Sequence, residues 1–295
     1  MTNVINVPPS LDEHTFEQVL SQMAAFPADA RLLIDARHTK WASPYGLGAL
    51  LTLGQTREGA RPTLAVPEAD DTLSYWTRAN FFYYANDFFD LKGVVPRRST
   101  ASESSVLLEL TPIHKSEDVH DVVGRIQSKA QKIIATELGI DPKAIVGFTM
   151  TLSEVCQNII EHAGRGGWVM VQTYNWTRRL GRRVVVIAVL DAGLGFRQSL
   201  ESAGNHVPTE RWDDAAALEA AVIRGVSRFR DPGRGQGLAG VRKYVGRWGG
   251  KLSVRSGTAR IAIVPDWDDD TPLEEGLAPF PGAQIQVTIP EKVSR

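Results

Sequence analysis

The pattern of apolar and polar positions predicts that strands and helices alternate in the first third of the chain. Short apolar runs of strand length are separated by stretches in which apolar residues recur at helical spacing. The predicted strands are 4–7, 31–35 and 62–66, and the predicted helices are 12–25, 45–55 and 73–84. This β-α-β-α-β order indicates a mixed sheet with helices packed on it.

The remainder of the chain has longer elements and ends in strands. The predicted helices are 117–138, 148–163 and 238–248, and the predicted strands are 106–110, 168–176, 184–190, 251–255, 260–264 and 283–289. A polar, Ser-rich stretch without apolar periodicity precedes these elements and has the character of a linker. We therefore expect an N-terminal domain over 1–96, a linker over 97–105 and a larger C-terminal domain over 106–295.

Composition narrows the class of protein. The 295 residues are 43% hydrophobic and 23% charged, as in soluble globular proteins. A net charge of -1 argues against binding nucleic acid by bulk charge. The longest apolar run, 184–190, is far too short to span a bilayer, and no signal peptide is recognisable. The single cysteine, Cys156, excludes an internal disulfide and is expected to be a small buried hydrophobe. We expect a cytoplasmic protein.

One predicted helix carries a polar stripe. Glu154, Asn158 and His162 recur every four residues, so they share one helical face. A carboxylate, an amide and an imidazole in a row can hold a ligand. By itself, however, such a stripe more often faces water or forms a structural network.

Two glycine-containing segments follow. Asp191 ends an apolar strand and can accept a hydrogen bond from an exocyclic amine, while Gly193 and Gly195 let the backbone approach a ligand. A glycine-rich loop at 231–240 precedes a helix, where free N–H groups and the positive end of the helix dipole suit phosphate. Alone, the first segment is more often a plain tight turn than a ligand site, and the second is moderate evidence for phosphate binding.

In this order and spacing, the three segments resemble the GHKL (Bergerat-fold) ATP-binding family, which includes gyrase, the ninety-kilodalton heat-shock chaperone, histidine kinases and anti-sigma-factor kinases. The resemblance extends over about 106–290 and is closest to the anti-sigma serine kinases. It implies that the C-terminal domain is a Bergerat-fold α/β sandwich that binds ATP and Mg²⁺. The matching ATP-binding positions are Asn158, His162, Asp191, Gly193, Gly195, Gly233, Arg234, Gly235, Gln236, Gly237, Leu238 and Thr288.

The resemblance also implies individual roles. Glu154 would be the general base for a water or a substrate hydroxyl, and Asn158 would hold the Mg²⁺ that bridges the phosphates. Asp191 would recognise the adenine amino group, supported by Thr288 through the network of Asp191. Gly233, Gly235 and Gly237 would cradle the phosphates. A lid would cover 196–232, with a helix at 213–228 inside it.

The N-terminal part resembles, more weakly, the STAS domain of anti-sigma-factor antagonists. The resemblance lies in LLIDARHTKWASPYGLGALLTLGQ, residues 32–55. Tyr45 occupies the position of that family's phosphoacceptor serine, and Ser43 lies two positions away. We therefore expect a docking or autoregulatory module in place of a phosphorylation switch.

Together these features predict an ATP-binding regulatory protein of the anti-sigma serine-kinase type. Its partner would be a protein, such as a sigma factor, a STAS antagonist or another signalling protein, and a homodimer is left open. The alternatives are an ATP-dependent interaction switch without phosphotransfer and a histidine-kinase-related signalling ATPase.

Two further segments have competing interpretations. An acidic loop at 265–282, with Asp266, Asp268, Asp269 and Asp270, is expected to be solvated and, less readily, to form a docking surface. The aromatic residues at 81–89 are expected either between the two domains or in the core of the first.

Overall fold

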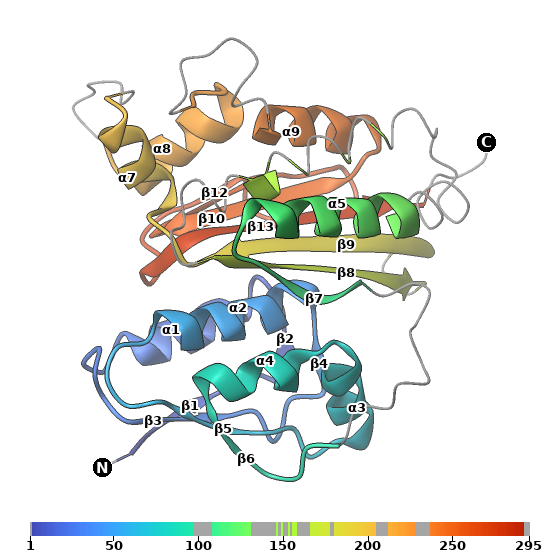
Figure 1. The fold of residues 1–295 in the computed structure, drawn as a ribbon. Helices are drawn as coiled ribbons and strands as arrows, with labels where there is room; N and C mark the ends of the chain where they lie inside the picture. The colour runs from blue at the N-terminus through green and yellow to red at the C-terminus, as the bar shows by residue number, and fades with distance from the viewer. Residues whose placement is uncertain are drawn as a thin grey trace.

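The computed structural model describes residues 2–96, 108–130, 146, 149, 153, 155–157, 166–177, 180–204, 212–227 and 237–291. These residues form two large sheets, with helices between the sheets and helices beyond the second sheet (Figure 1). The predicted linker, 97–105, lies outside the described residues. None of the helices in the described ranges has the length and apolar character that crossing a bilayer requires.

The first sheet is parallel throughout its described pairings. Its strands, in spatial order, are β1 (Asn3–Asn6), β3 (Leu32–Asp35), β5 (Thr63–Ala65) and β6 (Asp90–Lys92). A helical crossover separates each strand from the next, and this connection produces parallel pairing. The expectation of a mixed sheet is therefore wrong. A small parallel pair, β2 (Ser10–Leu11) and β4 (Trp41–Ala42), lies apart from this sheet.

The crossovers carry α1 (Phe16–Met23), α2 (Pro44–Thr56), α3 (Asp70–Arg78) and α4 (Phe81–Phe88). The single helix predicted over 73–84 is therefore two helices. Asn80 separates them in the left-handed conformation, with φ of 63°. Asn is one of the few residues that adopts this conformation, which ends a right-handed helix. The apolar periodicity contained no signal for this interruption.

The second sheet has seven strands, and all its pairings are antiparallel. Its spatial order is β12 (Leu273–Glu274), β11 (Ala259–Ile263), β10 (Lys251–Gly257), β13 (Phe280–Pro290), β9 (Arg182–Asp191), β8 (Gly167–Trp176) and β7 (Leu108–Ile113). One face packs against α5 (Ser116–Ala130), α7 (Gly195–Ser202), α8 (Asp214–Leu218), a π-helical turn (Glu219–Ile223) and α9 (Gly237–Arg247). This part is a two-layer sandwich of antiparallel sheet and helices.

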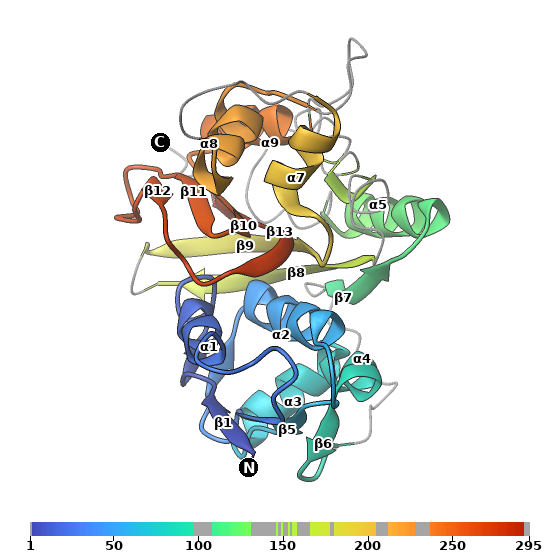
Figure 2. The ribbon, with the colours of Figure 1, turned by 90° about the vertical axis from the view of Figure 1, so that its left-hand side faces the viewer.

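Helices of the N-terminal part cover the other face of the second sheet (Figure 2). Side chains of β8 and β9, including Trp168 and Leu190, belong to the same apolar cluster as α2. The aromatic residues at 81–89 occupy both expected environments: Phe81 packs on Trp76, and Tyr84 lies 5.0 Å from Trp168 between ring centroids. The two parts therefore share one apolar core.

Beside this apolar region, the same face of the sheet is polar and buried. Lys251 and Arg260 are 4% and 2% exposed. The Lys251 ammonium lies 3.1 Å from Asp268 and 2.8 Å from Asp270, and Arg260 lies 2.9 Å from Asp270. The expectation of a solvated acidic loop is therefore wrong for Asp268 and Asp270, although Asp266 and Asp269 are exposed. Lys251 and Arg260, which pair with these two carboxylates, lie on strands that precede the loop. The charge pattern of the loop alone therefore does not indicate that Asp268 and Asp270 are buried.

Candidate nucleotide site

Asp191 ends β9 and points toward the helical layer. Val185, Ile187 and Val189 alternate along β9 and join the apolar core beneath the helices. Successive strand side chains face opposite sides of a sheet, so Asp191 shares their side. It is the one carboxylate in the run of residues from Val184 to Asp191, and it comes at the edge where the strand gives way to a turn.

The two carboxylate oxygens of Asp191 have different surroundings. Oδ1 accepts hydrogen bonds from the backbone N–H of Gly193, at 2.8 Å, and from that of Ala283, at 3.2 Å. Among the described residues, no donor lies within hydrogen-bond distance of Oδ2. The side chain is thus held in place by one oxygen while the other remains an acceptor for a ligand.

The environment of Asp191 also shifts its proton affinity. Burial of the carboxyl raises the pKa of Asp191 to about 6, and the two backbone N–H groups act in the opposite direction. Above that pH the carboxylate is an anion with one oxygen open. This arrangement suits the amino group of a nucleobase, which donates a hydrogen bond and carries no charge.

A second, uncharged network positions the turn after β9. Ser256, 3% exposed, donates from its Oγ to the carbonyl of Gly282 at 2.8 Å and accepts from the N–H of Phe196 at 3.1 Å. It thereby connects the start of α7 to β13, the strand whose Ala283 N–H bonds to Asp191. Gly195, at φ of +75°, leaves no room for a Cβ, which would lie 2.6 Å from Ser256 Oγ. Neither Ser256 nor Gly282 could be predicted from the sequence, because their partners are distant along the chain.

Replacing Gly282 with Ala should damage this site. Gly282 has φ of +79°, and a Cβ there would overlap the backbone of Asp191. We expect Gly282→Ala to lower the free energy of unfolding by about 2–5 kcal/mol, combining backbone strain with overpacking. Gly276→Ala is the matched control, since Gly276 also has positive φ, of +72°, but has nothing within 4 Å of its Cβ position. It should lose only about 1–2 kcal/mol. Equal losses in urea unfolding would contradict the close approach to Asp191.

Thr288 does not join the network of Asp191. On β13, Ile285, Val287 and Ile289 face the helical layer. Thr288 alternates with them and lines a cavity on the opposite face of the sheet. It also pairs with Val186, whereas Asp191 lies beyond the pairing of Leu190 with Gln284. The role expected for Thr288 is therefore wrong, because the strand alternation places it on the other face.

The remaining ATP-binding positions are only partly described. Leu238, 7% exposed, belongs to the apolar core, and Gly237 begins α9. The following positions lie outside the described residues: Glu154, Asn158, His162, Gly233, Arg234, Gly235 and Gln236. Helical residues beside the polar stripe are described, and they include Cys156. Cys156 is fully buried, as expected, and burial raises the pKa of its thiol to about 12.

The described part of the predicted lid is anchored to the sheet. The Asp214 carboxylate, at the start of α8, accepts from the N–H and the hydroxyl of Thr258, both at 2.8 Å. Leu200 and Ala217 form a small apolar cluster between α7 and α8. Helical conformation after Asp213 ends at Ile223, earlier than the expected 213–228. Residues 205–211 and 228–232 of the predicted lid lie outside the described ones.

Neither Ser43 nor Tyr45, at the start of α2, presents its hydroxyl at the surface. Tyr45 is 2% exposed, and burial raises the pKa of its phenol. Its hydroxyl has no hydrogen-bond partner within the described part of the chain. Ser43, 3% exposed, caps α2 by accepting from the N–H of Gly46 at 3.0 Å. Both side chains therefore support the packing of α2 in this conformation.

The part of the chain that carries Asp191 matches a known protein family. A family model described as histidine kinase-, DNA gyrase B-, and HSP90-like ATPase matches residues 144–292, just over half of the 295 residues. The match includes Asp191 and most of the antiparallel sheet. None of the curated proteins matches the chain. Domains of this family bind ATP, typically with Mg²⁺. The chain belongs to the histidine kinase-, DNA gyrase B-, and HSP90-like ATPase family, and residues 144–292 form its ATP-binding domain.

Proposed function

We propose that the chain is a regulatory protein of the anti-sigma serine-kinase type, which binds Mg²⁺–ATP and phosphorylates a Ser or Thr of a partner protein. The observation that supports it most directly is Asp191, whose Oδ1 is fixed by two backbone N–H groups while Oδ2 stays open among the described residues. That oxygen fits the amino group of adenine. The kinase type rests on the sequence resemblance around Glu154 and Asn158.

The proposed chemistry divides between two sets of residues. Asp191 selects adenine, and the glycine-rich loop at 233–237 supplies N–H groups to the phosphates. Asn158 would hold Mg²⁺, which offsets the phosphate charge when bound. Glu154 accepts the proton of the partner's hydroxyl as that oxygen attacks the terminal phosphorus, and the bond to the bridging oxygen breaks so that ADP leaves. The N-terminal part, which resembles a STAS domain, serves as a docking or autoregulatory module.

One observation favours a second candidate, an ATP-dependent interaction switch without phosphotransfer. An ion pair between Glu17, which is partly buried, and the buried Arg255 joins the N-terminal part to the ATP-binding sheet. A nucleotide that altered the sheet could thereby change the surface that the N-terminal part presents. In this function, the signal is a conformational change that ATP binding favours, and no phosphoryl group is transferred.

Two variants separate these candidates. We expect Glu154→Gln to bind ATP as tightly as the wild type but to lose phosphoryl transfer by about 100-fold or more, because the base is gone. Asn158→Ala should lose the Mg²⁺-dependent part of the affinity. Calorimetry with ATP, with and without Mg²⁺, measures binding. Incubation with γ-labelled ATP and a phosphatase-treated lysate measures transfer to protein Ser and Thr.

The outcomes assign the function. Label on Ser or Thr that depends on Glu154 supports the kinase. If Mg²⁺–ATP binds tightly but neither the wild type nor Glu154→Gln transfers label to protein, the result supports the switch. Failure of the wild-type chain to bind ATP at about 1 mM would reject both.

A further inference from the structure

A cavity of about 530 Å³ lies between the loop that precedes α1 and the second sheet. Its floor includes Gln286 and Thr288, on the face of the sheet opposite to Asp191. None of the residues that fix Asp191 lines it. Its volume is within the range of small-molecule sites, about 300–1,000 Å³. It is therefore a separate site from the nucleotide site, built by both parts of the chain.

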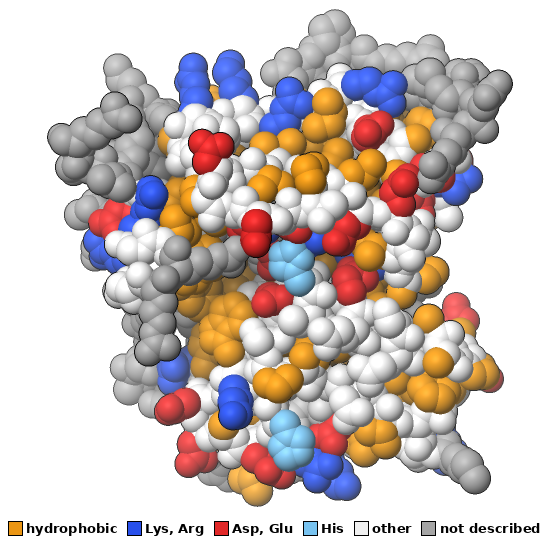
Figure 3. Space-filling view, turned by 180° about the vertical axis from the view of Figure 1, so that it is seen from behind, with side chains coloured by type: hydrophobic (Ala, Val, Ile, Leu, Met, Phe, Trp, Pro, Cys, Tyr) orange, Lys and Arg blue, Asp and Glu red, His pale blue; other side chains and the backbone are white. Residues whose placement is uncertain are grey.

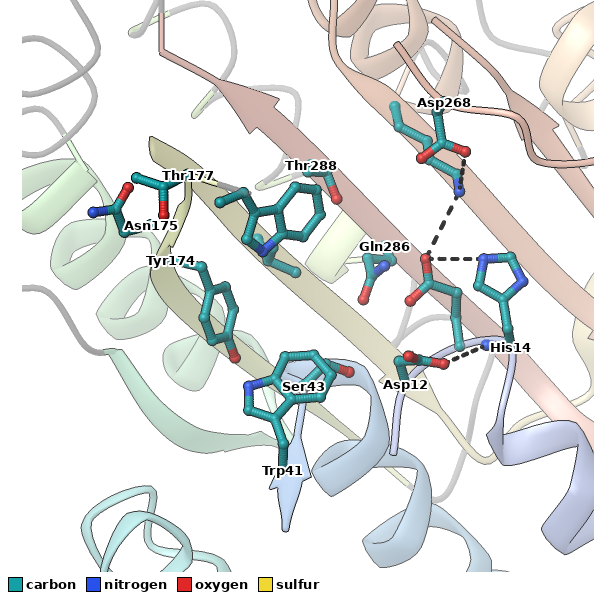
Figure 4. A pocket seen from close by; sticks show the side chains of 14 residues that line it. Asp12, His14, Trp41, Ser43, Tyr174, Asn175, Thr177, Asp268, Gln286 and Thr288 are labelled. Carbon is teal, nitrogen blue, oxygen red and sulfur yellow. Dashed lines mark hydrogen bonds and ion pairs between the residues drawn. The ribbon is translucent and has the colours of Figure 1, made fainter. Parts of the chain in front are cut away.

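One end of the cavity is aromatic. Trp41, Tyr174 and Trp176 line it, and the rings of Trp41 and Tyr174 meet edge to face with centroids 5.5 Å apart. Figure 4 shows Trp41 and Tyr174 on one side of the cavity, Asp12 and His14 on the other, and Gln286 between them. Such rings offer an apolar surface to a flat ligand body and attract cations to their faces.

The other end is acidic. Glu13 is 8% exposed, and its carboxylate lies 3.7 Å from His14 and 4.0 Å from Lys251. Within the described residues these long contacts are all that it makes, with no hydrogen bond. The Lys251 ammonium is closer to Asp268 and Asp270, at 3.1 and 2.8 Å. Lys251 therefore pairs mainly with Asp268 and Asp270, and no cation lies closer than 3.7 Å to the carboxylate of Glu13 among the described residues.

The balance of charge around this end is negative. The carboxylates of Glu13, Asp268, Asp270 and Glu274 are connected through two permanent cations, Lys251 and Arg260, and through His14. Figure 3 shows acidic side chains gathered around a histidine midway up the molecule. A ligand that entered from this side would meet a field that attracts cations and repels anions.

Gln286 provides the second, independent indication of a ligand. Its side chain lines the cavity and is 5% exposed, yet its Oε1 has no hydrogen-bond partner among the residues that the structure describes. A buried acceptor without a donor is unfavourable, and native proteins keep few of them. A ligand that donates a hydrogen bond here would satisfy it.

We propose that this cavity binds a small organic cation, an ammonium group on a flat and largely apolar body. The ammonium donates to the carboxylate of Glu13 and to Oε1 of Gln286. The flat body lies against Trp41 and Tyr174. The binding site thus consists of a hydrogen-bonding acidic end and an aromatic end, which together reject an anion of the same shape.

The test uses the full chain and two matched probes. Tryptamine carries an ammonium on an indole body, and indole-3-propionate carries a carboxylate on the same body. We expect calorimetry to detect tryptamine binding below about 1 mM, at least about tenfold tighter than indole-3-propionate. No nucleotide is added, so the result is independent of the proposed ATP-dependent function.

Gln286→Leu gives the most informative variant. Because Oε1 has no partner, an apolar residue of similar size removes an unsatisfied group and loses no hydrogen bond. We expect this variant to melt at or above the wild-type temperature while binding tryptamine about tenfold or more weakly. A residue kept only for stability would not show that combination. Glu13→Gln should also weaken binding, whereas Glu201→Gln, on the exposed face of α7, should leave it unchanged.

Three results would overturn the proposal. They are absence of tryptamine binding at about 1 mM, equal or tighter binding of indole-3-propionate, and unchanged tryptamine affinity in Gln286→Leu. If Glu13→Gln melts far below the wild type, Gln286→Leu decides the question alone.

Discussion

Replacing Asp191 with Asn is expected to weaken ATP binding by about 10- to 100-fold while leaving the protein folded. The Asn Oδ1 can still accept from the N–H groups of Gly193 and Ala283, which bond to Oδ1 of Asp191 at 2.8 and 3.2 Å. The variant presents an NH₂ group where Asp191 presents its open Oδ2. Two donors then face each other when the adenine amino group enters, so the contact becomes repulsive.

Inosine triphosphate is the matched ligand for this variant, because it carries a carbonyl oxygen in place of the amino group. The wild type should prefer ATP over inosine triphosphate, and Asp191→Asn should remove or reverse that preference. Calorimetry measures the affinity of the wild type and of Asp191→Asn for both nucleotides, and the four affinities give the change in selectivity. Unchanged selectivity in the variant would show that Oδ2 does not contact the base.

The pH dependence follows from the same carboxyl. Burial raises the pKa of Asp191 to about 6, so protons compete with adenine below that pH. We expect ATP affinity to be flat above about pH 7 and to fall about tenfold between pH 7 and 5. The nucleotide's own phosphates also titrate, and the Asp191→Asn protein measures that contribution. An identical fall in both proteins would exclude Asp191 as its source.

Stability without ligand should show the opposite trend. The folded protein binds the Asp191 proton more tightly than the unfolded chain, in which the pKa of this carboxyl is close to its ordinary value of 3.8. The corresponding stability is fully present below about pH 4 and is lost as pH rises through about 6. The melting temperature of the wild type relative to Asp191→Asn should therefore rise on acidification across this window.

The local pattern of apolar and polar residues predicted most helices and strands of the fold, but it did not predict the contacts between them. Apolar runs identified strands such as β8 and β9 because burial on both faces leaves a recognisable sequence. The break at Asn80 was missed because a single left-handed residue does not disturb apolar periodicity. The acidic loop was expected to be solvated, but Asp268 and Asp270 are paired with Lys251 and Arg260. These two cations are brought to the loop by the pairing of β10 with β11, which the sequence of the loop does not show.

The same limit applies to the site. Asp191 could be predicted as a candidate because a carboxylate followed by two spaced glycines is a local signal. Ser256 and Gly282 were not, since each acts through partners far along the chain. The role expected for Thr288 was wrong because successive residues of a strand face opposite sides of the sheet. The register of the strand decides which face a residue occupies, and a shift of one position reverses the face.

Removing Glu17 is expected to lower the free energy of unfolding by about 3–5 kcal/mol. The guanidinium of Arg255, 1% exposed, makes a two-point contact with the Glu17 carboxylate at 2.5 and 3.1 Å. These residues lie 238 positions apart and join α1 to β10. In Glu17→Ala, Arg255 would keep carbonyl contacts to Gly257 and Ala278 but lose its counter-charge in a buried setting.

Two controls separate this effect from the loss of any ion pair. Arg197 and Glu201 form a pair at 3.0 Å with both side chains about 40% exposed, so Glu201→Ala should cost only about 0–1 kcal/mol. The double variant Glu17→Leu/Arg255→Met replaces both charges with apolar groups. It should recover most of the stability lost in Glu17→Ala, because no buried charge remains unpaired.

The way in which Glu17→Ala unfolds then tests whether the two sheets act as one unit. The N-terminal helices share an apolar cluster with β8 and β9, so the wild type should unfold in a single calorimetric transition. Losing the ion pair weakens the contact between the parts, and we expect a second transition to separate at lower temperature. If Glu17→Ala behaves like Glu201→Ala, the pair is incidental to the docking. If it behaves as expected, a change at α1 reaches β10, the strand that also carries Ser256 beside the nucleotide site.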